Sequence, residues 1–226
     1  MNKLKKYFII PLTAILVSFF FSACSGANVP DTPVPDKETN IAENSNISDG
    51  NADNENDGNT NTDISEPIES KIDSEVLSKL EKFNVTSKNL NNNVWDDVIS
   101  NLDKGENHSP ELTWDTVEGA NCYVIIMVDT DAFNWVHWVS SGISDTSIPE
   151  GYSPNSDYVG PYPPKGATHN YEVYVLALKE EPERIKTSMD SADPLFTKNL
   201  EALDVNSAGE SGNIISYGCI VGQFSH

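Results

Sequence analysis

The sequence predicts a mainly β domain of the α+β class, in which the helices are few and peripheral. The run from Cys122 to Val128 is apolar without alternation, which indicates a strand covered on both faces. The run from Tyr171 to Leu178 is rich in β-branched and aromatic residues, which favour strands. Because a turn signal at Gly119-Ala120 precedes the first run and few segments have helical spacing, strands should dominate.

The other elements follow from the same patterns. Ser74 is suited to cap a helix and the apolar residues after it have helical spacing, so Ser74–Lys82 is expected to be a short helix. Strands are expected at Phe83–Ser87 and Trp138–Ile143, and a helix at Pro194–Leu203, with Pro near its first turn. The segment Gly212–Gln223 fits a helical turn or a terminal strand, and Cys219–Phe224 is its better strand.

The N-terminus has the layout of an export signal. A basic start, Lys3–Lys6, precedes a mostly apolar run from Tyr7 to Phe21, shorter than the ~20 residues of a membrane-spanning helix. The small residues before Cys24 resemble a bacterial lipobox, in which the cysteine thiol is acylated with diacylglycerol and becomes the new N-terminus. We therefore expect residues 1–23 to be a lipoprotein signal peptide and Cys24 to anchor the chain on the extracytoplasmic face of a cell membrane. An ordinary signal peptide is the alternative.

Residues 25–70 contain no aromatic residue and carry eleven acidic side chains against the single Lys37. Such a composition cannot bury enough apolar surface to offset the cost of ordering the backbone. Residues 24–70 are therefore expected to be the lipidated cysteine and a disordered acidic tether, and residues 71–226 a single domain. The tether holds about half of the net charge of −21, so the acidity of the whole chain says little about the domain's ligand. A negative net charge does argue against a nucleic-acid partner, which requires a basic surface.

Two cysteines remain in the predicted domain, and both lie in apolar segments. An oxidising compartment permits a disulfide between Cys122 and Cys219. Free cysteine is also a common small core residue, and we favour unpaired thiols. No His-x-x-x-His or Cys-x-x-Cys spacing supports a metal site, and no cofactor is expected.

Three polar clusters lie at the ends of strand-like segments. They are Asp129-Thr130-Asp131, Trp135-Val136-His137-Trp138, and a loop containing Gly160, Tyr162, Pro163 and Pro164 that leads to His169-Asn170-Tyr171. Each cluster alone has an ordinary explanation: Asp caps strand ends, His137 packs between tryptophans, and Pro and Gly shape turns. Together they predict one pocket that contains two carboxylates and two imidazoles.

Several chemistries fit such a pocket. A metal site lacks the usual ligand spacing, and nucleophilic catalysis lacks a Gly-x-Ser-x-Gly motif. Hydrolysis by carboxylates remains open. Anion binding by imidazoles and backbone amides requires the fewest assumptions. Asp129 and Asp131 are then expected to orient the imidazoles and to raise their pKa.

The same residues resemble a known family. Ser109–Trp114, Asp129–Ala132, His137-Trp138, Asp157–Gly160, Pro163–Gly166 and His169–Tyr171 are similar, in order and spacing, to the phosphatidylethanolamine-binding protein family and its bacterial branch. The resemblance runs from about Phe83 to the C-terminus. It implies two stacked antiparallel sheets with peripheral helices and a small surface pocket for phosphate, acetate or a phospholipid head group. The pocket would be formed by Asp129, Asp131, His137, His169 and Tyr171, with residues 160–164 as one wall.

The chain departs from this pattern at three positions. Thr130 and Phe133 stand where the family usually has Pro, so the rim is expected to be less stiff and the mouth narrower. Asn170 stands where the family usually has Arg, which removes a donor that supports the pocket loops. We expect a membrane-anchored, non-enzymatic protein that binds a small anion or head group. The alternatives are an inhibitor that blocks a kinase or protease partner through its surface, and a hydrolase with His137 and Asp129 as acid/base pair.

Overall fold

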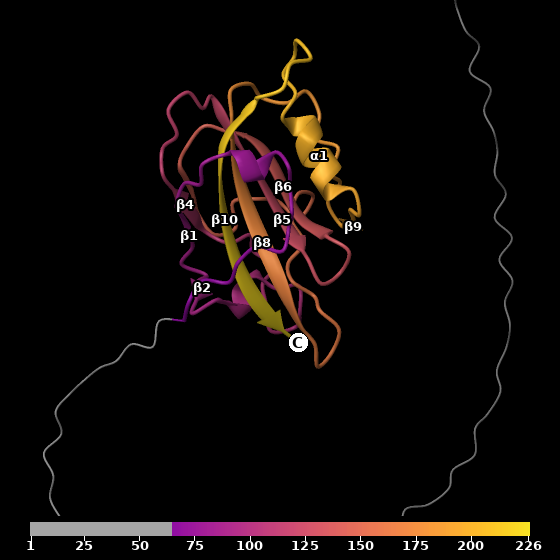
Figure 1. Ribbon diagram of the computed structural model, residues 1–226. Coiled ribbons are helices and arrows are strands. Elements are labelled where there is room, and N and C mark those ends of the chain that lie inside the picture. Colours follow the sequence, from indigo (N-terminus) through magenta and orange to yellow (C-terminus); the bar gives the residue numbers. More distant parts are fainter. Residues whose placement is uncertain (1–64) are drawn as a thin grey trace, which may run out of the picture. The chain divides into compact units, whose positions relative to one another are not determined.

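The computed structural model describes residues 65–226, which form a seven-stranded and a three-stranded sheet with one α-helix (Figure 1). The predicted signal peptide, Cys24 and most of the predicted tether lie outside the described residues. The strands are β1 Val85–Thr86, β2 Leu90–Asn91, β3 Val94–Trp95, β4 Leu112–Trp114, β5 Cys122–Asp129, β6 Trp135–Ile143, β7 Ser147–Ile148, β8 Thr168–Leu178, β9 Ser191–Ala192 and β10 Ile214–Ser225. The helices are η1 Leu77–Lys79 and η2 Asp97–Ile99, both 3₁₀, and α1 Phe196–Leu203.

The large sheet has the strand order β2-β3-β10-β8-β5-β6-β9, and the small sheet has the order β1-β4-β7. Strands β10, β8, β5 and β6 are antiparallel neighbours, whereas β10 meets β3 in parallel at a single pair, Gln223 and Val94. The prediction of two sheets with peripheral helices is confirmed, and the parallel contact is the departure from a purely antiparallel arrangement.

Alternation along the central strands divides the core into two layers. Ile125 and Met127 of β5 belong to the cluster shared with Leu112 and Trp114 of the small sheet. Their neighbours along β5, on the other face, pack with Phe196, Leu200 and Leu203 of α1. The two-sided burial predicted for Cys122–Val128 is therefore confirmed, because one face meets the small sheet and the other meets α1.

Several boundaries differ from the predicted ones. The helix predicted at Ser74–Lys82 is only the single 3₁₀ turn η1, since three apolar residues supply too little packing to extend a helix past its costly first turn. Strand β6 begins at Trp135 and β8 at Thr168, both earlier than predicted. The ambiguous segment at Gly212–Gln223 is strand β10. Cys122 and Cys219 are free thiols, as favoured from the sequence.

Contacts with the sheet begin before the predicted domain start at Lys71. The Asn93 side-chain amide donates to Ser65 Oγ and to the Glu66 carbonyl. Ser70 Oγ and the Lys71 backbone amide each donate to the buried carboxylate of Glu172 on β8, both at 2.7 Å. These bonds fix the last residues of the predicted tether onto the domain. Between residues 65 and 226, no helix is long and apolar enough to cross a membrane.

Candidate functional site

The C-terminal end of β5 and the N-terminal ends of β6 and β8 lie together at one end of the large sheet, where a cavity of about 310 Å³ is found. Asp129, the last residue of β5, lies opposite Trp135 at the start of β6 and opposite Tyr171 near the start of β8. The cavity is lined by Asn101, Asp129, Ala132, Trp135, His137, Val159, Gly160, Tyr162, Pro164, His169 and Asp190. Six of the nine predicted site residues are among them: Asp129, His137, Gly160, Tyr162, Pro164 and His169.

Asp129 and His169 form the central polar pair of this cavity. The Asp129 side chain is almost fully buried, and its Oδ2 lies 2.6 Å from Nδ1 of His169. Its Oδ1 accepts the backbone N–H of Asp131 at 2.9 Å. Both carboxylate oxygens are thus occupied by donors from the protein. Asp129 therefore orients the His169 ring, as predicted, and does not present a bare charge to a ligand.

His137 lies on the other side of the cavity and is held by a neutral group. Its Nδ1 lies 2.8 Å from the Val159 carbonyl oxygen. Because a carbonyl only accepts, Nδ1 must carry the proton, and in the neutral ring Nε2 then carries the lone pair. Burial lowers the pKa of His137 and outweighs the opposing effects of the bond to Val159 and the charge of Asp129. The expectation that the carboxylates raise this pKa is therefore wrong for His137. The predicted acid/base pair is also not hydrogen-bonded, since the Asp129 carboxylate bonds to His169 instead.

One wall of the cavity is the segment 157–164, which is paired to β6. The Val159 N–H donates to the His137 carbonyl at 2.8 Å, so His137 and Val159 exchange two hydrogen bonds. The Gly160 N–H donates to Oδ1 of Asn107 at 2.7 Å, and a Cβ at Gly160 would overlap the Ile99 carbonyl oxygen. Only glycine permits this close backbone approach, so the wall is rigid without the additional prolines that the family pattern has at the opposite rim.

Tyr171 lies behind the cavity, fully buried, and does not line it. Its ring packs edge-on against His137, with the ring centroids 5.2 Å apart. Burial, followed by the charge of the nearby Asp129, raises the pKa of its hydroxyl, which stays protonated. Among the described residues this hydroxyl has no hydrogen-bond partner of good geometry. The polar groups near the hydroxyl are the Asp129 carboxylate and the backbone of Tyr162.

Two other predicted residues lie outside the lining. Pro163 turns its carbonyl toward Nδ1 of His226, which donates to it at 2.9 Å. Asp131 was expected to point the same way as Asp129 because two positions separate them on an extended chain. The chain instead turns directly after Asp129, where the Asp131 N–H folds back onto the Asp129 carboxylate. The alternation of a strand therefore no longer applies at Asp131.

Asp131 supports the rim of the cavity from outside. Lys71 Nζ donates to Oδ1 of Asp131 at 2.6 Å, and the backbone and side-chain amides of Asn170 each donate to Oδ2 at 2.7 Å. Partial burial alone would raise the pKa of Asp131, but these bonds outweigh it and lower the pKa. The donor expected to be missing at Asn170 is thus supplied jointly by Asn170 and by Lys71, at the end of the predicted tether.

The sequence interpretation missed five lining residues. Ala132, Trp135 and Val159 are adjacent to predicted site residues, so the three clusters contained the signal for them. Asn101 and Asp190 come from distant parts of the chain. The Asn101 N–H donates to Pro161 O at 3.1 Å and the Asp190 N–H to Val136 O at 2.8 Å, and these contacts leave no local pattern in the sequence.

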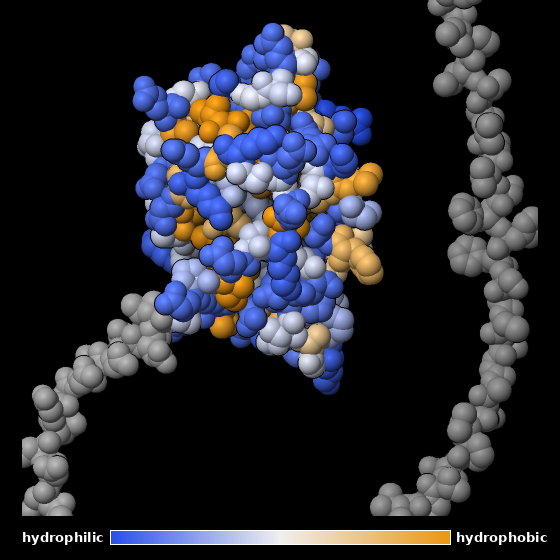
Figure 2. Space-filling view, in the orientation of Figure 1, coloured by the Kyte–Doolittle hydropathy of each residue, from blue (hydrophilic) through white to orange (hydrophobic). Residues whose placement is uncertain are grey.

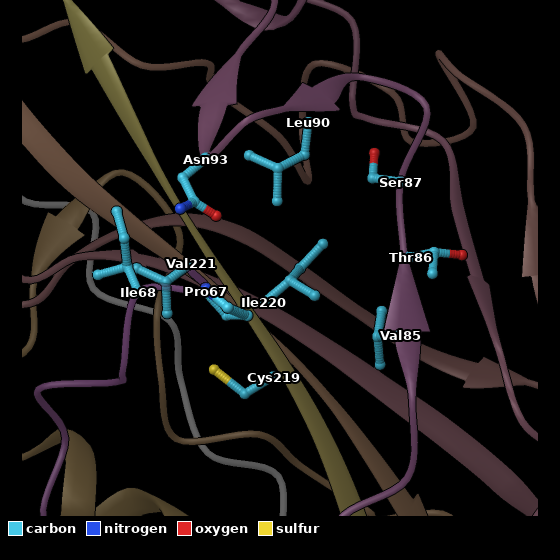
Figure 3. A pocket seen from close by; sticks show the side chains of 10 residues that line it. All are labelled: Pro67, Ile68, Val85, Thr86, Ser87, Leu90, Asn93, Cys219, Ile220 and Val221. Carbon is cyan, nitrogen blue, oxygen red and sulfur yellow. The ribbon is translucent and has the colours of Figure 1, made fainter. Parts of the chain in front are cut away.

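A second cavity of about 270 Å³ lies between the N-terminal segment, β1 and β10 (Figure 3). We call it the apolar groove. It is lined by Pro67, Ile68, Val85, Thr86, Ser87, Leu90, Asn93, Cys219, Ile220 and Val221. None of its side chains carries a formal charge at neutral pH, since burial, followed by the charge of Glu172, raises the pKa of the Cys219 thiol to about 12. The groove therefore lacks a charged group that would pair with a charged ligand.

Comparisons with known proteins show the family to which the chain belongs. The family model described as phosphatidylethanolamine-binding protein matches residues 80–216. The candidate lipoprotein LppC of Mycobacterium tuberculosis is 38% identical over 84 residues, which cover 30% of this chain and 42% of LppC. UPF0098 protein YbhB of Escherichia coli K12 is 34% identical over 100 residues, covering 34% of this chain and 63% of YbhB. The chain thus matches less than two thirds of the length of these curated relatives.

Two crystal structures were also matched. E. coli YbcL, described as a new member of the mammalian PEBP family, is 25% identical, with 64% of this chain and 99% of that chain covered and a TM-score of 0.49. The PEBP homologue CT736 of Chlamydia trachomatis is 20% identical, with 65% and 99% covered and a TM-score of 0.48. Because the family model spans more than half of the sequence, including every residue that lines the cavity, the chain belongs to the phosphatidylethanolamine-binding protein family.

Proposed function

We propose that the domain binds a small anion or a phosphorylated head group in the cavity between Asp129, His137 and His169. The observation that carries the proposal is the Asp129–His169 pair, 2.6 Å apart at the base of a cavity with a second imidazole across from it. The carboxylate is already satisfied by the protein, so it fixes an imidazole for a ligand. A protonated phosphate or carboxylic acid group can donate its O–H to the Nε2 lone pair of neutral His137, and either anion can accept from an imidazole that is protonated.

Binding without chemistry is favoured over hydrolysis, since the carboxylate that a hydrolase would pair with His137 is bonded to His169.

We also propose that acylation of Cys24 holds the domain at the extracytoplasmic face of a membrane. The lipobox-like sequence before Cys24 supports this, and the name of LppC describes that relative as a candidate lipoprotein. The substitution Cys24→Ser should move the protein out of the detergent phase or leave an uncleaved precursor. Unchanged membrane association without a precursor would contradict the anchor.

The pocket is tested by titrating inorganic phosphate and phosphoethanolamine into the wild type, His137→Ala and His169→Ala in a calorimeter. Each substitution should weaken binding by about 10- to 100-fold, which corresponds to the roughly 1.5–3 kcal/mol of a hydrogen bond to a charged group. His108→Ala is the matched control, because His108 is an exposed imidazole paired with Glu150 outside the cavity. It should bind like the wild type.

Equal affinity of all four proteins would place the anion site elsewhere. Absence of binding by every protein would leave the alternative that this chain acts on a protein partner through its surface.

A further inference from the structure

Four large apolar side chains are exposed around the mouth of the cavity. Phe133 is 82% exposed, Leu195 62%, Tyr162 61% and Trp135 36%. Trp135 and Tyr162 also line the cavity. We refer to these four residues as the apolar rim. Exposed apolar residues that gather around a binding site indicate an interaction surface.

Phe133 is held in an unfavourable backbone conformation. It is followed by Asn134 in a tight turn in which the Trp135 N–H donates to the Ala132 carbonyl at 3.1 Å. Both central residues have positive φ, 55° at Phe133 and 53° at Asn134. Asn and Gly suit such positions, whereas a bulky residue there is strained. The turn therefore projects an aromatic ring into solvent at a cost to stability.

The four residues come from three segments that meet at the mouth. Trp135 on β6 lies opposite Ala192 on β9, and the Asp193 N–H donates to the Asn134 carbonyl at 3.1 Å. Leu195 follows directly after this contact and precedes α1. The space-filling view shows apolar surface projecting at the edge of the molecule beside β9 and α1 (Figure 2). Tyr162 belongs to the segment 157–164, another wall of the cavity, so the rim includes residues from more than one wall.

The N-terminal segment reaches the domain beside the same loop. Lys71 Nζ bonds to Asp131, which lies in the β5–β6 loop that also contains Phe133. The 64 residues that precede the described part of the chain, with the predicted lipid anchor at Cys24, join it at Ser65, which is bonded to Asn93 next to β3. Because β3 meets β10 at Gln223, opposite Asn170 of β8, this point lies at the same end of the large sheet as the cavity. An anchor joined at this point permits the mouth to face the membrane that holds it.

We propose that the apolar rim docks on the surface of a phospholipid bilayer, with Phe133 and Trp135 at the level of the lipid head groups. Aromatic rings favour this interface because they are apolar and tolerate a wet edge. The mouth of the cavity then opens toward the lipid head groups. This inference rests on the proposed function, which gives the ligand class, and it adds the bilayer as the source of the ligand. Residues 65–226 hold 26 acidic and ten basic residues, so zwitterionic lipids are preferred to anionic ones.

Tryptophan fluorescence provides a local readout in the full chain. Trp95, Trp114 and Trp138 are at most 4% exposed, whereas Trp135 is 36% exposed. Quenching by phospholipids brominated in their acyl chains therefore reports on Trp135. The full chain would be reconstituted into vesicles of phosphatidylcholine and phosphatidylethanolamine, with and without bromine. The readout is independent of what anchors the chain, because no tryptophan precedes Trp95.

Wild-type emission should be quenched by the brominated lipid, and Phe133→Asn should lose at least half of that quenching. Asn suits a positive φ, so this variant removes the ring without disturbing the turn. Val205→Asn is the matched control, since Val205 is an exposed apolar residue that precedes β10, at the other end of the large sheet. It should be quenched like the wild type. Adding phosphatidylglycerol should reduce quenching in the wild type.

Vesicle-bound wild type without quenching, or equal quenching of Phe133→Asn, overturns the proposal. So does a change of oligomeric state in Phe133→Asn without quenching in the wild type, which would assign the rim to a second copy of the chain. Phosphoethanolamine affinity in Phe133→Asn should stay within about twofold of the wild type. Lost quenching with retained affinity separates docking from the pocket, and quenching without any ligand binding contradicts only the proposed function.

Discussion

The two cavities of this domain are similar in volume and opposite in chemistry. The cavity at the ends of β5, β6 and β8 has about 310 Å³ and is lined by two imidazoles and two carboxylates. The apolar groove has about 270 Å³ and contains only uncharged side chains, including a protonated thiol. In the polar cavity, Asp129, His137 and His169 converge from three strands, whereas the N-terminal segment contributes the apolar residues Pro67 and Ile68 to the apolar groove. Size therefore does not distinguish a binding site from a packing defect; the convergence of polar groups does.

The largest effect is expected on the free energy of unfolding, when the N-terminal segment that lines the apolar groove is removed. A chain that begins at Ile72 lacks Pro67 and Ile68 over the groove and both N-terminal donors to buried Glu172. Removing two of the three donors to a buried carboxylate, of which only the Tyr174 hydroxyl then remains, should lower the free energy of unfolding by about 1–3 kcal/mol. Urea unfolding measures this loss.

The matched control for that truncation is a chain that begins at Ser65, which retains all of these contacts. In the full chain, Ser70→Ala should lose part of the same stability, whereas Ser78→Ala, at an exposed serine, should not. Identical unfolding curves for chains beginning at Ser65 and Ile72 would show that the N-terminal segment contributes nothing to the fold.

A smaller effect is expected on the pH dependence of stability, at the polar cavity. Burial lowers the pKa of His137 in the folded protein below its ordinary value of 6.5. The unfolded chain therefore binds this proton first as pH falls, so the folded state loses stability from about pH 6.5 down through the lowered pKa. In His137→Gln that loss should be absent.

The measurement is the free energy of unfolding in urea at several pH values between 7.5 and 5, for the wild type, His137→Gln and the control His108→Gln. The wild type and the control should fall together, and His137→Gln should fall less. Parallel curves for all three proteins would mean that His137 titrates as it does in solvent.

The smallest effect is expected at the thiol of the apolar groove. Burial and the charge of Glu172 raise the pKa of Cys219 to about 12, and burial also raises that of Cys122. Since the thiolate is the reactive form, iodoacetamide at pH 8 should label both slowly in the folded protein and readily in urea. Mass spectrometry of digested protein measures the labelling. Rapid modification of Cys219 in the folded chain would indicate a reactive site in the groove.

The fold was predictable where one short segment contained the whole signal. The apolar run of β5, which does not alternate, indicated burial on both faces of the strand. The β-prone run of β8 indicated the strand that pairs with it. That six of the predicted site residues line one cavity was predictable because they lie within three compact clusters near strand ends. The contribution of Lys71 was not, because it follows an acidic segment without apolar residues and meets Asp131, 60 positions later.

Orientation was less predictable than position. Asp131 was misplaced because the rule of alternation holds only while a strand continues, and β5 ends at Asp129. The pKa of His137 was mispredicted because the sequence shows the neighbouring carboxylates but not the degree of burial, which is the larger effect here. Phe133 was expected to narrow the mouth, yet the positive φ of its turn directs the residue to solvent.

The bond between Ser70 and Glu172 also has a consequence for how this sequence can change over evolutionary time. A carboxylate in the middle of a sheet face is acceptable only while donors reach it, and one of those donors is a hydroxyl 102 positions away. Replacement of Ser70 alone leaves the carboxylate with the Tyr174 hydroxyl and the Lys71 N–H, whereas replacement of Glu172 removes the acceptor that all three donors share. The acid at 172 is therefore the position on which the other three depend, and sequences that lose it should be free to lose the hydroxyls at 70 and 174.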